Sequence, residues 1–232
     1  ILFLILALTF SFAHAADAPH SDVLPSDDTA IVHLLNRLGY GPRPGDVAKV
    51  REIGVEKFID SQLSPNAIPD PDIERRLTGF KTLTMSTTEL MEAFPPPDPR
   101  NRKENAQPRG RRPGNEIILE LSKAKLLRAV YSERQLREVM TDFWFNHFNV
   151  FTAKGILPWV VPSYERDVIR PRALGKFRDL LGAVAESPAM LFYLDNWMSA
   201  GDPPPAAAGD PGRQALRSRH PRWFRDISPP RQ

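Results

Sequence analysis

Apolar residues recur with helical spacing through most of residues 26–199. The first stripe has four members at positions i, i+3, i+4 and i+7 of one helix: Ile31, Leu34, Leu35 and Leu38. The polar run Ser26-Asp27-Asp28 before it is typical of a helix start, and Gly39 after it is typical of a helix end. The pattern therefore predicts one amphipathic helix between these two signals.

Further helices are expected along the chain, because the same spacing returns between turn signals. Their expected positions are 46–53 (ended by Gly54), 58–63 (ended by Ser64-Pro65), Asn115 to about Tyr131, 177–184, and 188–194 (opened by Ser187-Pro188). No segment of useful length alternates between apolar and polar residues as a strand does. The predicted fold class is therefore all-α.

The segment 133–150 is predicted to be the central helix of the fold. Ser132 and Gln135 match a capping box at its start. One face carries an apolar stripe, and further aromatic residues crowd the other sides: Leu136, Val139, Met140 and Phe143, then Trp144, Phe145, Phe148 and Phe151. A helix that is apolar on nearly all faces is expected to be surrounded by protein. We therefore expect an irregular multi-helix bundle around this aromatic-rich helix.

Polar residues on the central helix are candidates for a site. Asp142, Asn146 and Asn149 share one face, and His147 lies on the side of Phe143. Unpaired polar groups are costly to bury, so these side chains need partners. They either line a functional site, with Asp142 and His147 as candidate catalytic groups, or satisfy one another across the bundle.

A second charged cluster occupies residues 164–170 (YERDVIR). Arg166 and Arg170 are one helical turn apart and could grip a carboxylate or phosphate, while Asp167 is a candidate partner for an arginine. The alternative is an ion-pair network that joins two helices. Asp195, near the end of the helical region, could be a ligand or the residue that forms a turn.

Charge and proline are concentrated in two segments. Residues 95–114 carry +4 and residues 200–232 carry +3, whereas the whole chain carries only +3. The body is therefore acidic, and bulk charge gives no support for nucleic-acid binding. Residues 95–114 are expected to form an exposed basic loop, and residues 200–232 a disordered tail rich in proline and arginine.

The first residues resemble an export signal. Ile1 to Phe12 are almost all apolar, and Ala13-His14-Ala15 fits the small-x-small pattern before a cleavage point. No basic segment precedes them. We expect residues 1–15 to be a signal peptide that is incomplete at its start, residues 16–25 a linker and residues 26–199 the helical domain. A membrane anchor that is not cleaved is the alternative.

Motifs for known chemistries are missing from the sequence. There is no cysteine, no phosphate-binding glycine loop, no nucleophile elbow and no pair of histidines at metal-ligand spacing. We therefore expect no metal and no cofactor.

Three stretches resemble the bacterial family called Domain of Unknown Function 1800. They are residues 33–44 (HLLNRLGYGPRP), 140–149 (MTDFWFNHFN) and 164–197 (YERDVIRPRALGKFRDLLGAVAESPAMLFYLDNW). The resemblance covers about 28–199. It implies an exported or envelope-associated bacterial protein of mostly helical fold, with no established activity.

The sequence departs from this family after Trp197. Members of the family continue into a further helical region with a motif like N-x-N-x-A-R-E-L-x-E-L-H-T-L-G, whereas residues 200–232 here show no periodicity. One hypothesis is a frameshift or premature end, which would leave a fragment with an open site. The other is a genuine disordered tail.

Two functions remain as hypotheses. The first is a binding or scaffold module of the cell envelope, periplasmic or extracellular, with an envelope protein as its candidate partner. The second is an exported hydrolase with Asp142 as base and Arg166 or Arg170 as anion holder. For both, we expect no nucleic-acid partner, and membrane contact only through the N-terminal segment if it stays uncleaved.

Overall fold

The computed structural model describes residues 26–97 and 113–199, which form helices and, within those ranges, no strand. The elements are α1 (Asp28–Leu38), α2 (Asp46–Ile53), α3 (Val55–Leu63), η1 (Pro65–Ala67), α4 (Pro71–Leu77), η2 (Lys81–Leu83), α5 (Thr87–Ala93), α7 (Pro113–Tyr131), α8 (Gln135–His147), α9 (Leu157–Ser163), η4 (Tyr164–Ile169), η5 (Arg170–Arg172), α10 (Phe177–Ala185), α11 (Pro188–Tyr193) and η6 (Asn196–Met198). The all-α prediction is confirmed. The predicted signal segment, the linker, residues 98–112 of the predicted loop and the predicted tail lie outside the described residues.

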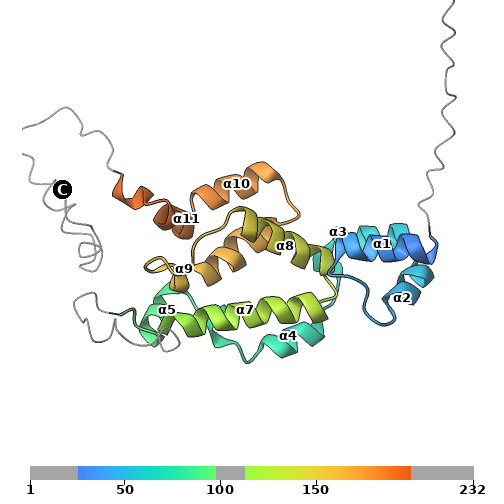
Figure 1. Ribbon diagram of the computed structural model, residues 1–232, viewed down its shortest axis with the longest axis horizontal. Coiled ribbons are helices and arrows are strands. Elements are labelled where there is room, and N and C mark those ends of the chain that lie inside the picture. The colour runs from blue at the N-terminus through green and yellow to red at the C-terminus, as the bar shows by residue number, and fades with distance from the viewer. Residues whose placement is uncertain (1–25, 98–112, 200–232) are drawn as a thin grey trace, which may run out of the picture.

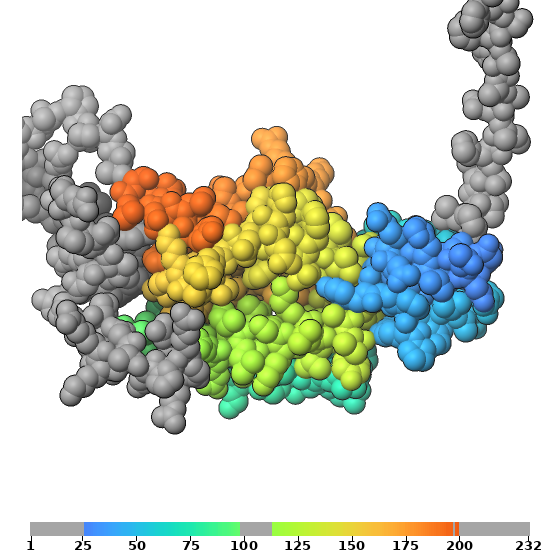
Figure 2. All heavy atoms as spheres, viewed as in Figure 1, coloured from blue at the N-terminus to red at the C-terminus, as the bar shows by residue number. Residues whose placement is uncertain are grey.

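The helices are arranged in layers around the long helix α7 (Figure 1). Helix α4 and the turn η2 pack against one side of α7, and α8 and α9 pack against its other side. The π-helix η4 contacts α8 and α9, and α5 packs against α9. Helices α10 and α11 lie beyond that second layer. The first three helices, α1 to α3, project as a lobe at one end of the molecule (Figure 2).

The lobe has a small core of its own. Its buried residues are Ile31, Leu35, Val50, Val55 and Phe58. The predicted limits of α1 and α2 and the predicted end of α3 are confirmed, whereas α3 begins at Val55, three residues before the predicted position. Asp27 caps α1 by accepting a hydrogen bond from Ala30 N at 2.8 Å. The hydrophobic stripes and the cap are local signals, which is why the sequence shows them.

The lobe docks on the start of α8 through the residues that follow α1. Gly39 has an extended backbone, and a Cβ atom there would lie 3.0 Å from Gln135 Oε1, so close packing rather than a left-handed turn requires glycine. Tyr40 N donates to that same oxygen at 3.2 Å, and Arg43 forms an ion pair with Glu133 at 3.0 Å. The first stretch that resembles the family therefore contacts the start of α8, although the two segments lie about ninety residues apart in the chain.

The main core lies between α7, α9, η4, α10 and α11. Its largest fully buried side chains include Leu157, Val161, Tyr164, Ile169 and Leu180. Helix α9 had no predicted counterpart, since prolines at 158 and 162 hide its helical character in the sequence. It is nevertheless buried on most sides.

The predicted start of α7 is wrong by three residues. The helix begins at Pro113, which suits a first helical position, rather than after Asn115. Gly114 is buried, and a Cβ atom there would lie only 2.7 Å from Pro158 Cβ. The last two residues of the loop predicted for 95–114 therefore belong to the packed helix α7.

The predicted capping box of the central helix is also wrong. Helix α8 begins at Gln135, and Ser132 Oγ donates to Asp70 at 2.6 Å instead of capping it. The cap comes from α3: Gln62 Oε1 accepts from Leu136 N at 3.1 Å, and Gln62 Nε2 donates to the Glu133 carbonyl at 2.9 Å. A residue so distant in sequence gives no local signal.

Helix α8 is not enclosed on every side, contrary to prediction. Phe143 is 52% exposed, and Phe151, just after the helix, is 60% exposed. The rings pack against one another at the surface: the centroids of Phe143 and Trp144 lie 4.8 Å apart in an edge-to-face arrangement, and those of Trp144 and Phe177 of α10 lie 5.7 Å apart with tilted rings. The buried side of α8 instead carries Leu136, Glu138 and Thr141. Stacking among neighbouring aromatic rings thus replaces burial under further helices within the described residues.

The cap on α8 can be tested with Gln62→Ala. Gln62 is only 4% exposed, so its loss leaves a buried amide and a buried carbonyl without partners. We expect the free energy of unfolding to fall by about 2 kcal/mol, measured by urea denaturation. The control is Lys57→Ala on the exposed side of the same helix, which should change stability by less than about 0.5 kcal/mol. Equal losses in both variants would contradict the capping role.

Candidate functional site

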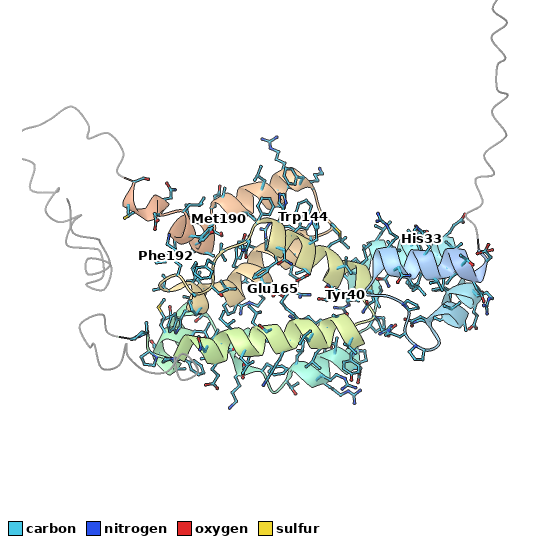
Figure 3. All side chains as sticks on the ribbon, in the orientation of Figure 1. His33, Tyr40, Trp144, Glu165, Met190 and Phe192 are labelled. Atoms are coloured by element: carbon cyan, nitrogen blue, oxygen red, sulfur yellow. The ribbon has the colours of Figure 1, made fainter. Side chains whose placement is uncertain are left out.

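A buried network of charges joins α7, α8 and η4. Arg170 Nη1 donates to both carboxylate oxygens of Glu138 at 2.8 Å, and its Nη2 donates to Glu165 Oε1 at 2.8 Å. Arg128 of α7 approaches the same Glu165 oxygen at 3.4 Å. Glu138 is 5% exposed and Glu165 is 1% exposed, so these charges interact away from bulk water. Figure 3 shows Glu165 between α7 and the helices that cover it.

The backbone of η4 explains how Glu165 and Arg170 meet. Residues Tyr164–Ile169 form a π-helix, in which hydrogen bonds join residues five apart. Glu165 and Arg170 are separated by five positions and therefore stack on one side of the wide turn. Turns of this kind are rare and occur frequently at functional sites.

The network perturbs the groups around it. Burial alone would lower the pKa of Arg170, but Glu138 and Glu165 raise it above its usual value. Burial raises the pKa of Tyr40 to about 12, and the negative charges of Asp142 and Glu138 act in the same direction. The Tyr40 hydroxyl lies 3.4 Å from the Glu138 carbonyl, to which it donates. Both groups are thus held in one protonation state over the physiological pH range.

A groove of about 490 Å³ opens beside this network. We call it the arginine groove. Its lining comes from η1, α8, η4, η5 and the turn that follows: Pro65, Asn66, Arg137, Arg166, Arg170, Pro171, Leu174 and Gly175. Three guanidinium groups line it, and no residue of that lining is acidic.

The three arginines differ in how far their charge is balanced. Arg166 binds both oxygens of Asp167 at 2.8 Å and the carbonyls of Leu83 and Met85. Arg170 is held by Glu138 and Glu165. Arg137 forms no hydrogen bond through its guanidinium within the described residues, and its nearest carboxylate oxygen, on Glu138, lies 3.8 Å away.

The predicted catalytic residues do not share one pocket. Asp142 forms an ion pair with Lys125 of α7 at 2.7 Å. His147 is exposed at the end of α8, where its ring stacks on Phe143 with 6.0 Å between centroids. Arg166 lines the arginine groove, which contains neither of the other two. The structure therefore separates the three side chains that the sequence suggested as a catalytic set.

The predicted binding residues are likewise divided. Asn146 donates to the Asp142 carbonyl at 2.8 Å, and Asn149 is exposed beyond the end of α8. Asp167 is paired with Arg166, and Asp195 has a left-handed backbone (φ 57°) and binds Lys154 at 2.8 Å. Only Arg170 of the five lines the groove. Asp195 has the backbone of the turn that the sequence favoured.

Sequence reasoning missed Arg137, Glu138, Glu165 and Arg128 as members of one site. Arg137 and Glu138 stand between apolar positions of α8 and resemble ordinary surface residues in the sequence. Glu165 is part of the charged run 164–170, but only the π-helix aligns it with Arg170. The five-residue spacing between them was the one available signal.

The described residues contain no group of three or more acidic or histidine side chains placed to hold a metal ion. Among the same residues, no helix is both long enough and apolar enough to cross a membrane.

The fold and site define an all-helical protein with a buried charge network beside an arginine-lined groove. Residues 33–205 match the family described as Protein of unknown function (DUF1800), so the chain belongs to that family. The resemblance seen in the sequence is confirmed. No curated protein and no solved structure matches the chain.

The charge network can be tested with Arg170→Met. The substitution leaves the carboxylates of Glu138 and Glu165 buried without their main partner, so the free energy of unfolding should fall by about 3–5 kcal/mol. Arg178→Met, at an exposed position of α10, removes the same charge and should have little effect. Chemical denaturation of both variants measures the difference. A loss no larger than that of the control would show that the network does not hold the helices together.

Proposed function

We propose that this chain is a binding module of a protein exported to the bacterial envelope, and that the arginine groove is its ligand-binding site. Three separate parts of the chain supply the walls: η1 after α3, the first turn of α8, and the segment from η4 to Gly175. A concave site of this size between helices is typical of small-molecule binding.

The observation that carries this proposal is the chemistry of the lining. Within the described residues, the groove presents guanidinium groups, one amide and apolar side chains, but no carboxylate, imidazole, hydroxyl or thiol from its lining side chains. General acid–base or nucleophilic catalysis needs such a group within hydrogen-bond reach of the reacting atoms. The groove is therefore suited to holding a ligand rather than transforming it.

Rigidity of the groove also supports binding. Arg166 is anchored to two backbone carbonyls from the η2 region, and Arg170 is fixed by two carboxylates. Side chains that are already ordered lose little further conformational entropy when a ligand arrives. A preorganised wall of this kind favours affinity.

The alternative of a hydrolase gains less support. Its candidate base, Asp142, is held by Lys125 on the side of α7, whereas Arg166 and Arg170 line the groove. An acid–base mechanism would require these groups to approach the same substrate atom.

Ligand recovery distinguishes binding from hydrolysis. The full chain is incubated with a small-molecule extract of bacterial periplasm, separated by gel filtration and analysed by mass spectrometry. We expect a bound molecule that is recovered chemically unchanged after long incubation, in the wild type and in Asp142→Asn alike. Cleavage products that depend on Asp142 would contradict binding alone and favour the hydrolase. Recovery of no bound molecule would also contradict the proposal.

Export is proposed from the apolar run Ile1 to Phe12 and the Ala13-His14-Ala15 pattern. Residues 1–25, placed behind a start codon and fused to alkaline phosphatase, should give an active reporter, because that enzyme matures only in an oxidising compartment. Leu6→Arg breaks the apolar run and should abolish reporter activity, whereas Thr9→Ser should not. Cytoplasmic retention of the unaltered fusion would overturn the export proposal.

A further inference from the structure

We propose that the arginine groove binds the oxyanion of a small molecule, a carboxylate or a phosphate, and that the guanidinium of Arg137 is the group that grips it. This inference rests on the proposed binding function and adds the chemistry of the ligand. It depends on the charge balance of the site, the position of Arg137 and the shape of the groove.

The charge balance leaves one guanidinium without a hydrogen-bonded carboxylate. Arg128, Arg137 and Arg170 surround two buried carboxylates, Glu138 and Glu165. A third buried carboxylate, Asp70, acts on Arg137 from a greater distance and accepts its hydrogen bonds from Ser132 and Glu133. Both oxygens of Glu138 are taken by Arg170, and Arg166 is matched by Asp167. The cluster therefore carries a net positive charge at Arg137, next to the groove.

Arg137 is held in an environment that disfavours an isolated charge. Its side chain is only 19% exposed, and its Nε atom is buried without a hydrogen-bond partner. Burial lowers the pKa of Arg137, and the nearby positive charges of Arg170 and Arg134 lower it further against the opposing effects of Glu138 and Asp70. A bound anion would supply the missing hydrogen bonds and the missing negative charge together.

The geometry of guanidinium suits this role. The group is planar and offers parallel N–H donors that match two oxygens of a carboxylate or phosphate. Arg170 and Arg166 use most of their N–H donors in hydrogen bonds to protein groups, so they contribute mainly a positive electrostatic potential to the groove. The Arg137 guanidinium forms no hydrogen bond to the described residues, and the exposed part of its side chain can face a ligand. Asn66, an exposed residue of the same lining, offers an amide N–H as a second contact.

The shape of the groove limits the occupant to a small molecule. Its volume of about 490 Å³ falls within the range of ordinary ligand pockets. Pro65, Pro171 and Leu174 provide apolar wall around the arginines. The ligand is thus expected to carry one oxyanion on a compact, partly apolar body.

Isothermal titration calorimetry of the full chain tests the proposal, with inorganic phosphate and acetate as separate probes at constant ionic strength. We expect saturable binding of at least one probe in the millimolar range, since a bare ion makes only part of the contacts of a whole ligand. Preference for phosphate would assign a phosphorylated ligand, and preference for acetate a carboxylic acid.

Variants at residue 137 decide whether this residue is responsible. Arg137→Gln should weaken binding by about tenfold or more, because a charge-assisted pair is lost. Arg37→Gln removes the same charge from an exposed position of α1 and should leave binding unchanged. Arg137→Lys keeps the charge but loses the planar fork, and should bind several-fold more weakly than the wild type. Circular dichroism and melting temperature confirm that each variant is folded.

The contrary outcomes are distinct from those of the binding proposal. Absence of saturable binding of both probes, or unchanged affinity in Arg137→Gln, would overturn the oxyanion inference. Recovery of an intact but uncharged molecule from the periplasmic extract would also overturn it, while leaving the binding function in place. Full affinity in Arg137→Lys would refute the bidentate grip.

Discussion

The contact of Arg170 with Glu138 and Glu165 is the constraint on which the rest of the structure depends. It joins α8 to the π-helix η4, and Arg128 extends it to α7, so three elements meet at one set of charges. Net stability is not the main result of such a network, because desolvation offsets much of the Coulomb energy. The network has a stronger effect on how the helices are positioned, because these groups can all be paired only when α8 and η4 meet in this register. The wall of the arginine groove is fixed by the same contact.

A second constraint lies where the lobe α1–α3 meets α8. Gln62 caps α8, Gly39 allows Gln135 to approach, and Arg43 and Lys49 both pair with Glu133. These contacts are polar and directional, whereas the core of the lobe is apolar and separate from the main core. The lobe therefore folds around its own small core and is oriented by hydrogen bonds and ion pairs. The position of η1, which supplies one wall of the groove, follows from this orientation.

The aromatic surface of α8 shows that a segment rich in aromatic residues can remain partly exposed. The sequence contains so many rings between Phe143 and Phe151 that complete enclosure was expected. The structure places Trp144 and Phe148 against Phe177 and leaves Phe143 partly open, while Trp144 donates to the Ala173 carbonyl at 3.0 Å. Aromatic rings pack against one another at this surface. One of the buried positions of α8 is instead occupied by Glu138, whose charge can be buried because Arg170 pairs with it.

The sequence by itself determined the all-α class, the family and the limits of several helices, because caps, glycines and hydrophobic stripes act within a few residues of one another. It also drew attention to the charged run 164–170. Tertiary structure decided everything that depends on distant residues meeting: the cap from Gln62, the early start of α7 against Pro158, and the choice of partner for each arginine. Whether an arginine is paired with a carboxylate of the protein or is free to bind a ligand depends on which carboxylates lie near it in the folded structure. For that reason the sequence does not show that Arg137 is a candidate binding residue. Its role becomes visible only when α8, η4 and η1 are folded against one another.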